Sequence, residues 1–198
     1  MFVTFEGLDG SGKTTQLELL RSHLAASGRE VVATREPGGT ELGEQLRRLV
    51  LHGEEMTAWA EAALFAAARA EHVERVIRPA LRRGAVVLCD RYIDSSVAYQ
   101  GGGRNLGIDG VLALNLQTTG SLQPHVTFLL LLEPGEAAER VGADPDRIER
   151  EHEEFRSRVD EAYRELARRF PDRIVALDGK LSPERIAEVV RERVDNLL

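Results

Sequence analysis

A glycine-rich turn near the start of the chain carries the residues with the most specific chemistry. It has the pattern G-x-x-x-x-G-K-[ST], with a short apolar segment before it and helical periodicity after it. In such a turn the backbone N–H groups point inward at phosphate oxygens, and the positive end of the following helix faces the same point. We predict that a nucleoside triphosphate binds here, through Gly7, Leu8, Asp9, Gly10, Ser11, Gly12, Lys13, Thr14 and Thr15.

Two side chains of this loop have roles of their own. The Lys13 ammonium would act in catalysis by bridging the β- and γ-phosphate oxygens, and the Thr14 hydroxyl would bind Mg²⁺. The alternative is a glycine-rich turn that binds nothing. Lys13 and Lys180 are the only lysines in the chain, and Lys13 occupies the position where this chemistry requires an ammonium, which favours the phosphate site.

A second group of charged residues follows the apolar segment 85–89, which is typical of a buried parallel strand. Because ligands bind at the carboxyl ends of parallel strands, Asp90 and Arg91 should lie beside the phosphate loop. Asp90 can hold Mg²⁺ through water, and Arg91 can bind an acceptor phosphate and the transferred phosphoryl group. Arg35, after the predicted strand 31–34, is a further candidate for the acceptor phosphate. For both arginines a simple ion pair is the alternative.

Two stretches could bind the rest of a second substrate. Phe65 and Arg69 lie four residues apart on a predicted helix, so a ring and a fork of N–H donors share one face. Together they can stack on a base and bind its edge, whereas a phenylalanine alone at position 65 would more often belong to the core. The polar, glycine-rich segment 94–103 adds hydroxyl and amide groups, at Ser95, Ser96, Tyr99 and Gln100.

Composition limits the kinds of protein that this chain can be. Its 198 residues suit one domain, no apolar run has the length of a membrane span, and the first residues lack the pattern of a secretory signal. The single cysteine, Cys89, excludes a disulfide framework and fits a reducing, cytoplasmic location. The net charge of −7 argues against nucleic acid as a partner, but not against a small anion held at a helix N-terminus.

Strand-like and helix-like segments alternate along the chain. We predict strands at 2–6, 31–34, 85–89, 126–132 and 174–177. We predict helices at 13–27, 42–51, 57–83 with a kink or break near Pro79, 107–119, after 134, 148–170 and 186–197, and an irregular segment at 90–107. This alternation predicts a parallel sheet covered by helices on both faces, with the active crevice at the carboxyl ends of the strands.

The phosphate loop is shared by several classes of protein. A GTPase switch should contain an Asn-Lys-x-Asp motif, but Asn precedes neither lysine, and an ABC-type or motor ATPase requires a much longer chain. A small kinase remains, in which a second substrate accepts the γ-phosphoryl group. Such an enzyme needs a second anion site and a closing lid.

Taken together, these motifs resemble those of the bacterial thymidylate kinases. The matching stretches follow the same order over essentially the whole chain, at 5–15, 34–40, 65–69, 90–95, 99–103 and 146–149. The resemblance implies a P-loop NTPase-type α/β fold of three layers, with about five parallel strands flanked by helices. It further implies one domain spanning 1–198, with a short helical lid at about 140–150.

The resemblance also implies an activity and an assembly. The expected reaction is phosphoryl transfer from ATP to dTMP, giving dTDP and ADP, with Mg²⁺ as cofactor. The chain is expected to form a homodimer and not to bind membranes. A deoxynucleoside kinase or another nucleoside-monophosphate kinase is the alternative enzyme. A nucleotide-binding switch that transfers nothing is the alternative from another class.

Roles for single residues follow from the same resemblance. Phe65 stacks on thymine and Arg69 donates to its O4, where cytosine would present an amino group and leave a donor facing a donor. Ser96 lies at the N3 edge of the base, and the Glu36–Pro37 peptide is expected to be cis. The sugar and phosphate contacts are implied for Tyr99 at C2′, Asp9 at the side of the 3′-hydroxyl and Arg91 between the donor and acceptor phosphates.

A catalytic arginine is expected from the lid. Some thymidylate kinases carry a basic residue within the phosphate loop, but here those positions are Gly10 and Ser11. The predicted lid has an arginine at each end, so we predict that Arg140, Arg147 or both stabilise the charge of the transferred group, with Arg150 as a further candidate.

Overall fold

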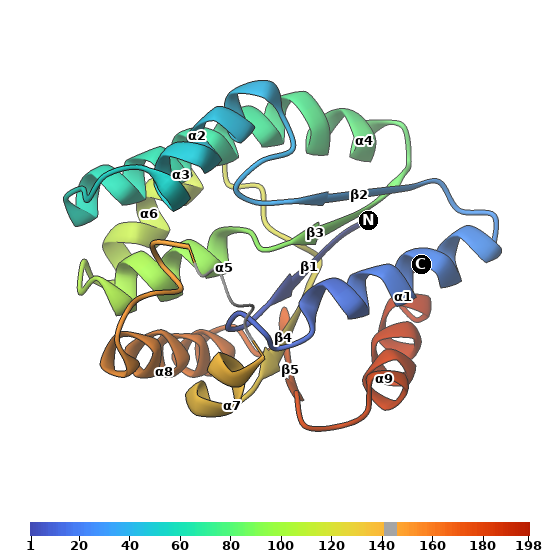
Figure 1. Cartoon of the computed structure of the whole chain (residues 1–198). Coiled ribbons are helices and arrows are strands. Elements are labelled where there is room, and N and C mark those ends of the chain that lie inside the picture. The colour runs from blue at the N-terminus through green and yellow to red at the C-terminus, as the bar shows by residue number, and fades with distance from the viewer. Residues whose placement is uncertain (141–145) are drawn as a thin grey trace.

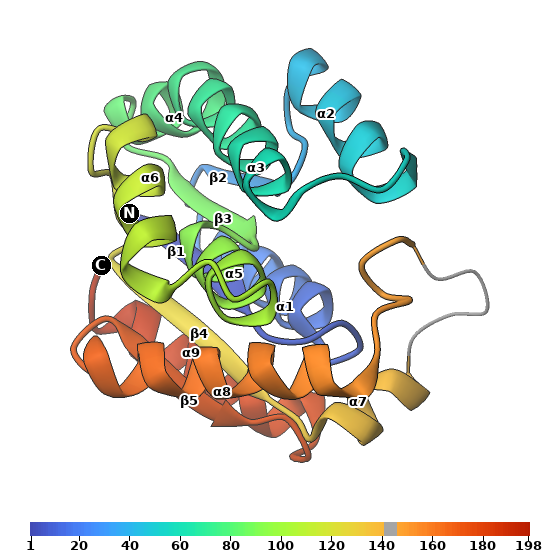
Figure 2. The ribbon, with the colours of Figure 1, turned by 90° about the vertical axis from the view of Figure 1, so that its left-hand side faces the viewer.

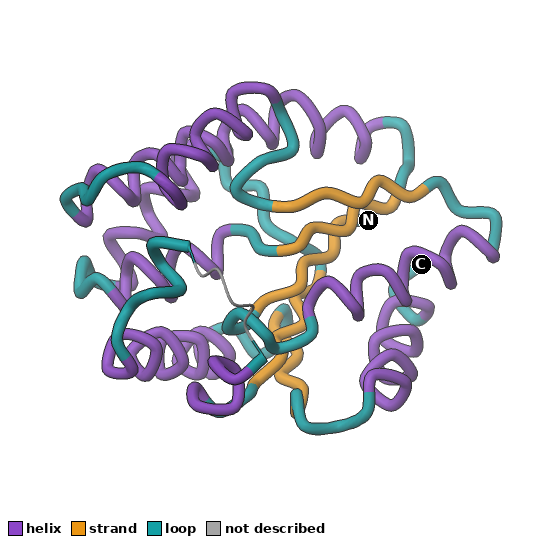
Figure 3. The backbone as a smooth tube through the Cα atoms, viewed as in Figure 1, coloured by secondary structure: helices purple, strands orange, loops and turns teal. Residues whose placement is uncertain are grey.

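The computed structural model describes residues 1–140 and 146–198, and a five-stranded sheet forms its centre (Figure 3). The strand order is β2-β3-β1-β4-β5, and every neighbouring pair is parallel. This confirms the predicted parallel sheet. The strands are β1 (Phe2–Glu6), β2 (Val31–Arg35), β3 (Val86–Asp90), β4 (Val126–Leu131) and β5 (Ile174–Asp178).

Helices cover both faces of the sheet (Figures 1 and 2). One face carries α1 (Lys13–Ala26) and α9 (Pro183–Asp195). On the other side lie α2 (Glu41–His52), α3 (Ala58–His72), the π-helical segment η1 (Val73–Ile77), α4 (Arg78–Arg82), α5 (Ile93–Ser96), the π-helical segment η2 (Val97–Gly103), α6 (Ile108–Thr118) and α8 (Glu153–Arg169). The short helix α7 (Pro134–Glu139) follows β4.

Alternate residues of each strand contribute to different halves of the core. Val3 and Phe5 of β1 pack with Leu20 of α1, whereas Phe2 packs into the cluster on the opposite face. By the same alternation Thr4 and Glu6 face the side of Phe2. A buried carboxylate is therefore directed to the face on which η2 and α8 lie.

The predicted helix 57–83 is not broken at Pro79. The chain continues from α3 through η1 into α4 (Figure 2). Pro79 lies at the start of α4. Proline lacks an N–H and its ring clashes with the carbonyl four residues earlier, so the wider π-helical turn just before it accommodates the ring.

The expectation of an irregular segment at 90–107 was wrong, because α5 and η2 occupy much of it. The glycines of η2 permit a close approach to α8. A Cβ added to Gly102 would lie 2.5 Å from Ala162 Cβ, and one added to Gly103 would lie 2.6 Å from the Phe155 ring. Packing against α8 therefore holds the polar segment in helical form, which local composition did not indicate.

This close approach predicts a stability effect. Gly102→Ala should lower the free energy of unfolding by about 1–3 kcal/mol, since the new methyl group also meets the Arg158 carbonyl oxygen at 3.1 Å. Gly135→Ala is the control, because an added Cβ there meets no described atom within 4 Å. Urea denaturation compares the two, and an equal effect of both variants would contradict the packing argument.

The C-terminal third differs from the prediction at the ends of its helices, and α9 spans Pro183–Asp195 rather than 186–197. Helix α8 begins at Glu153 rather than at 148, and the preceding residues form turns. The middle of the predicted lid, 141–145, lies outside the described residues. Among the helices that the structure describes, none combines the length and apolar character needed to cross a membrane.

Candidate active site

The phosphate loop connects β1 to α1 and leaves no room for side chains at two of its glycines. Gly7 has a φ of +135°, and a Cβ there would lie 2.4 Å from the Leu130 carbonyl oxygen. Gly10 has a φ of +82°, and a Cβ there would lie 2.5 Å from the Ala137 oxygen and 2.9 Å from Arg140 Cβ. The end of α7 and the residue after it thus lie directly against the loop.

The side chain of Lys13 folds back onto the backbone of the phosphate loop. Lys13 Nζ donates to the oxygens of Gly7 at 3.2 Å and Leu8 at 2.8 Å, and lies 3.7 Å from an Asp9 oxygen. Burial and the nearby Arg91 lower the pKa of Lys13, while Asp9 opposes this effect. These weak carbonyl contacts can be exchanged for phosphate oxygens.

Two further side chains of the loop differ in their access to a ligand. The Ser11 hydroxyl is buried without a hydrogen-bond partner in the described chain, and Ser11 does not line the pocket along the phosphate loop. Thr14 Oγ1 donates to Asp90 Oδ2 at 2.6 Å across the ends of α1 and β3. A hydroxyl and a carboxylate are oxygen ligands of the kind Mg²⁺ prefers. The structure therefore brings together Thr14 and Asp90, the pair predicted for the metal.

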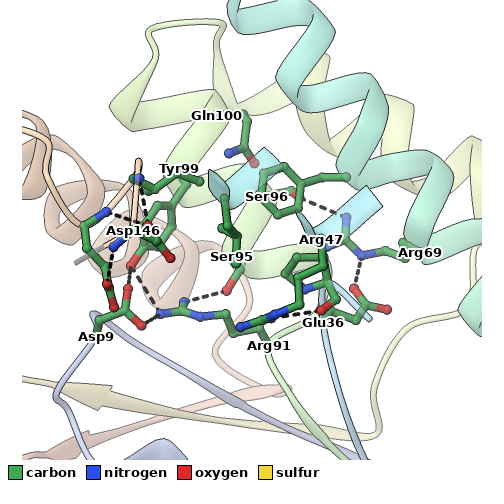
Figure 4. Close-up of a pocket in the computed structure, with 15 residues that line it drawn as sticks. Asp9, Glu36, Arg47, Arg69, Arg91, Ser95, Ser96, Tyr99, Gln100 and Asp146 are labelled. Atoms are coloured by element: carbon green, nitrogen blue, oxygen red, sulfur yellow. Dashed lines mark hydrogen bonds and ion pairs between the residues drawn. The ribbon is translucent and has the colours of Figure 1, made fainter. Parts of the chain in front are cut away.

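Arg91 lies at the centre of a hydrogen-bonded cluster (Figure 4). Its guanidinium donates to Asp9 Oδ1 at 2.6 Å, to Ser95 Oγ at 3.0 Å and to the Tyr99 hydroxyl at 3.3 Å. Burial alone would raise the pKa of Asp9, but Arg91 and Lys13 hold it well below its usual range. The cluster thus joins the phosphate loop to α5 and η2.

A carboxylate that the sequence analysis missed lies beneath this cluster. Glu6 is fully buried and accepts hydrogen bonds from the Tyr92 N–H at 2.7 Å, the Ser95 hydroxyl at 2.5 Å and the Tyr163 hydroxyl at 3.0 Å. Arg91 adopts a φ of +70°, which is uncommon for a residue with a side chain. Because Glu6 binds the next N–H along the chain, it holds the backbone in that conformation.

Glu6 predicts a dependence of stability on pH. Burial and the Asp94 carboxylate raise the pKa of Glu6 from 4.5 to about 7. Between these values the folded chain retains a proton that the unfolded chain has lost, so the contribution of Glu6 to the free energy of unfolding falls as pH rises from 4.5 to about 7.

Urea denaturation between pH 4.5 and 7 measures this effect. The fall in unfolding free energy across that range should be smaller in Glu6→Gln than in the unaltered protein, because glutamine does not titrate. Equal slopes for the two proteins would show that Glu6 does not titrate in this range.

Two neighbouring pockets meet at this cluster. The residues that line the first include the predicted substrate contacts Asp9, Phe65, Arg69, Arg91, Ser95, Ser96, Tyr99 and Gln100 (Figure 4). The second follows the phosphate loop, and its lining includes Lys13, Thr14, Thr15 and Asp90. Asp9, Glu36, Arg47 and Arg91 line both pockets. The wall between the two is therefore mainly charged.

At the far end of the first pocket, Arg69 is almost fully engaged by the protein. Its Nε donates to Glu36 at 2.6 Å, Nη1 donates to Ser96 and Asn115, and Nη2 donates to the Tyr92 oxygen at 3.0 Å. A guanidinium has five N–H groups. Within the described chain one N–H of Nη2 is left without a partner, and it can serve a ligand.

The structure assigns the two arginines near this wall differently from the prediction. Arg35 is 54% exposed, binds Glu44 at 3.0 Å and lines only the pocket along the phosphate loop. Arg47, which was not predicted, lines both pockets and donates to the Pro37 oxygen at 2.9 Å. The Glu36–Pro37 peptide is cis, as expected. Arg47 therefore has the position that had been expected for Arg35. Nothing in its spacing distinguishes it from Arg48, the other arginine of α2.

The two predicted lid arginines lie in different surroundings. Arg140 lies beside Gly10 of the phosphate loop. Arg147 donates instead to Glu61 at 2.7 Å and to the Val50 oxygen at 2.9 Å, and lines neither of the two pockets. The prediction that Arg147 shares the catalytic role is not supported by these contacts.

A phosphate loop that shares a charged wall with a second polar pocket defines a P-loop phosphotransferase with two anionic substrates. The sequence model described as "Thymidylate kinase" matches residues 5–190. The chain belongs to the thymidylate kinase family.

Relatives and a solved structure agree with this assignment. The chain is 50% identical to the thymidylate kinase of Synechococcus sp. (strain JA-3-3Ab) over 98% of its length and 97% of that protein. It is 46% identical to the thymidylate kinase of Symbiobacterium thermophilum over 100% of its length and 94% of that protein. The crystal structure of thymidylate kinase from Ehrlichia chaffeensis superposes with a TM-score of 0.83 at 32% identity, covering 98% of each chain.

Proposed function

We infer that the protein transfers the γ-phosphoryl group of ATP to the phosphate of dTMP, producing dTDP and ADP. The shared wall carries this conclusion, because Asp9, Arg47 and Arg91 face both pockets. The donor phosphate in one pocket and the acceptor phosphate in the other would both contact these residues and so lie close to each other. Phosphoryl transfer depends on such positioning and on neutralisation of the phosphate charge. The acceptor phosphate is already anionic, so no side chain has to remove a proton from it.

Cations of the chain stabilise the charge of the transferred group. Arg91 offers a planar fork to oxygens of both phosphates, and Lys13 would exchange its backbone oxygens for β- and γ-phosphate oxygens. Arg140 is the proposed third cation, and its support is its position against Gly10. An arginine in this role can raise the rate by about 10³-fold.

We propose that Mg²⁺ binds at Thr14 and Asp90, directly or through water. The support is the pairing of their two oxygens at the end of the phosphate loop. When bound, the ion neutralises charge on the β- and γ-phosphate oxygens. Chelation with EDTA should therefore abolish transfer, and added Mg²⁺ should restore it.

Selection of the acceptor is proposed to occur at both ends of the first pocket. Phe65 stacks on the base, and the remaining N–H of Arg69 donates to O4 of thymine. Tyr99, whose hydroxyl donates to Asp9 at 3.2 Å, limits the space at C2′ of the sugar, and Asp9 accepts from the 3′-hydroxyl. Hydroxyl and amide groups at Ser95, Ser96 and Gln100 complete the polar wall.

The remaining proposals concern organisation. We propose one domain over 1–198 with a lid at about 140–150, and a homodimer. Exposed Leu42 and Leu49 on α2 and exposed Trp59 on α3 support a dimer interface on these neighbouring helices. Light scattering after size exclusion would measure the assembly. A cytoplasmic location is proposed because ATP and dTMP are available there.

An assay coupled to ADP release tests the function, with dTMP, dUMP, UMP, CMP, AMP and thymidine as acceptors. We expect the highest kcat/KM with dTMP. A preference for thymidine would indicate a deoxynucleoside kinase, and a preference for another monophosphate would indicate a different kinase of this class. Binding of ATP without ADP release for any acceptor would indicate a nucleotide-binding switch.

A further inference from the structure

Glu61 of α3 is a buried carboxylate that lies behind the first pocket without lining it. Its side chain is only 1% exposed. Glu61 Oε1 accepts from the Gln100 amide nitrogen at 2.9 Å and from Arg104 Nε at 3.2 Å. Oε2 accepts from Arg104 Nη2 at 3.1 Å and from Arg147 Nη2 at 2.7 Å. Four donors thus converge on one carboxylate.

The contact to Gln100 determines which way round its amide lies. Burial alone would raise the pKa of Glu61, but hydrogen bonds from Arg104, Gln100 and Arg147 lower it, so the group is ionised. An ionised carboxylate only accepts hydrogen bonds, and it therefore requires the NH₂ group of the Gln100 amide. The carbonyl oxygen of that amide is the atom left for the pocket, whose wall includes Gln100 (Figure 4).

This orientation gives the pocket that Arg69 and Gln100 both line an acceptor besides the donor of Arg69. It moves the contact to N3 from Ser96, whose hydroxyl accepts from Arg69 Nη1 at 2.9 Å, to Gln100. Thymine presents a keto oxygen at C4 and an adjacent N3–H, which require a donor and an acceptor in that order. Cytosine presents an amino group and an unprotonated N3, so both positions are reversed. Thymine can therefore form a hydrogen bond both with Arg69 and with the Gln100 oxygen. Cytosine would place a donor against the Arg69 donor and an acceptor against the Gln100 acceptor.

We propose that Glu61 is a positioning residue for base selection, which fixes the Gln100 amide with its carbonyl oxygen toward N3–H of the pyrimidine. The inference rests on the proposed function, because it assigns a residue behind the same acceptor pocket. Glu61 touches neither substrate and acts through Gln100.

The isosteric variant Glu61→Gln should reverse the orientation of the Gln100 side-chain amide. Both Arg104 Nη2 and Arg147 Nη2 face the Oε2 position, whereas the one guanidinium N–H at Oε1 is that of Arg104 Nε at 3.2 Å. The new amide is therefore expected to direct its carbonyl oxygen to the Oε2 side, where it meets two guanidinium groups and the shorter contact. Its NH₂ group then faces Gln100, which has to present its oxygen inward and its own NH₂ group to the base. That donor suits N3 of cytosine. Arg69 still opposes the amino group of cytosine, so preference for thymine is reduced rather than reversed.

The test compares kcat/KM for dTMP with that for dCMP in the unaltered protein and in two variants. The ratio should fall by about tenfold in Glu61→Gln, since one of two mismatches is removed. Loss of the negative charge beside Arg104 and Arg147 affects both acceptors alike and cancels in the ratio. The control is Glu151→Gln, which removes a carboxylate that binds Arg104 but not Gln100, and it should leave the ratio unchanged.

A double-mutant cycle separates positioning from a general structural effect. Gln100→Leu removes the acceptor, so Glu61→Gln should cause no further loss of preference when added to it. Additive losses, or an unchanged ratio in Glu61→Gln, would overturn the proposal. If the unaltered protein fails to phosphorylate dTMP in the same assay, the proposed function is overturned instead.

A measurement on the unaltered protein covers the case in which Glu61→Gln does not fold. In protein labelled with ¹⁵N-glutamine, a side-chain NH₂ proton of Gln100 should exchange slowly with water, both free and with dTMP bound, because it remains on Glu61. Rapid exchange, or a new contact of this NH₂ group with the base, would overturn the proposal.

Discussion

Replacing Arg140 by alanine should lower kcat by about 10³-fold and leave the KM for dTMP within about threefold of its original value. The reason is its position: a Cβ on Gly10 would lie 2.9 Å from Arg140 Cβ, so this arginine starts beside the loop that holds the phosphates. A cation that acts on the charge of the transition state affects kcat far more than ground-state binding. Steady-state kinetics with saturating ATP measure the effect.

Arg147→Ala is the matched comparison, because Arg147 is held by Glu61 and the Val50 oxygen. This variant should lower the melting temperature, since it removes one partner of a buried ion pair, and change kcat by less than about tenfold. The reverse result, with kcat nearly normal in Arg140→Ala and strongly reduced in Arg147→Ala, would contradict the assignment.

The second large effect is expected at Arg91. Arg91→Ala should lower kcat/KM for dTMP by at least about 10³-fold, because it removes the one arginine among the described residues that both binds Asp9 and faces both pockets. Arg91→Lys should recover little of this loss, since an ammonium cannot present two parallel donors to phosphate oxygens. Steady-state kinetics of both variants check the prediction.

Arg47 and Arg35 provide the control for Arg91. Arg47→Ala should raise the KM for dTMP, whereas Arg35→Ala should leave it nearly unchanged, because Arg35 is exposed and paired with Glu44. If Arg91→Ala had no larger effect than Arg35→Ala, the charged wall between the pockets would not be the place of transfer.

The sequence predicts the donor half of this site well, for a local reason. A phosphate loop is one continuous turn, and its glycines, Lys13 and Thr14 are required by their own positions in that turn. The predicted strands also agree with the observed ones, because apolar runs such as 85–89 are long enough to indicate burial on both faces. Both signals are contained within a few residues.

The acceptor half depends on contacts between distant segments, and the sequence predicts less of it. Glu61, Gln100 and Arg147 come from three separate stretches and meet only after folding. Spacing along the chain does not indicate which carboxylate an arginine will bind, so Arg147 was expected at the phosphates. Glu6 was likewise part of a strand pattern, and only the fold places three donors around it.

A crystal structure with Mg²⁺, a non-hydrolysable ATP analogue and dTMP would show whether the two phosphates meet at Arg91. We expect the thymine ring on Phe65 with its O4 at Arg69 Nη2, and the acceptor phosphate facing the terminal phosphate of the analogue at Arg91. A pyrimidine bound away from Phe65 and Arg69 would contradict this expectation. So would two phosphates bound by different cations, with Arg91 not lying between them.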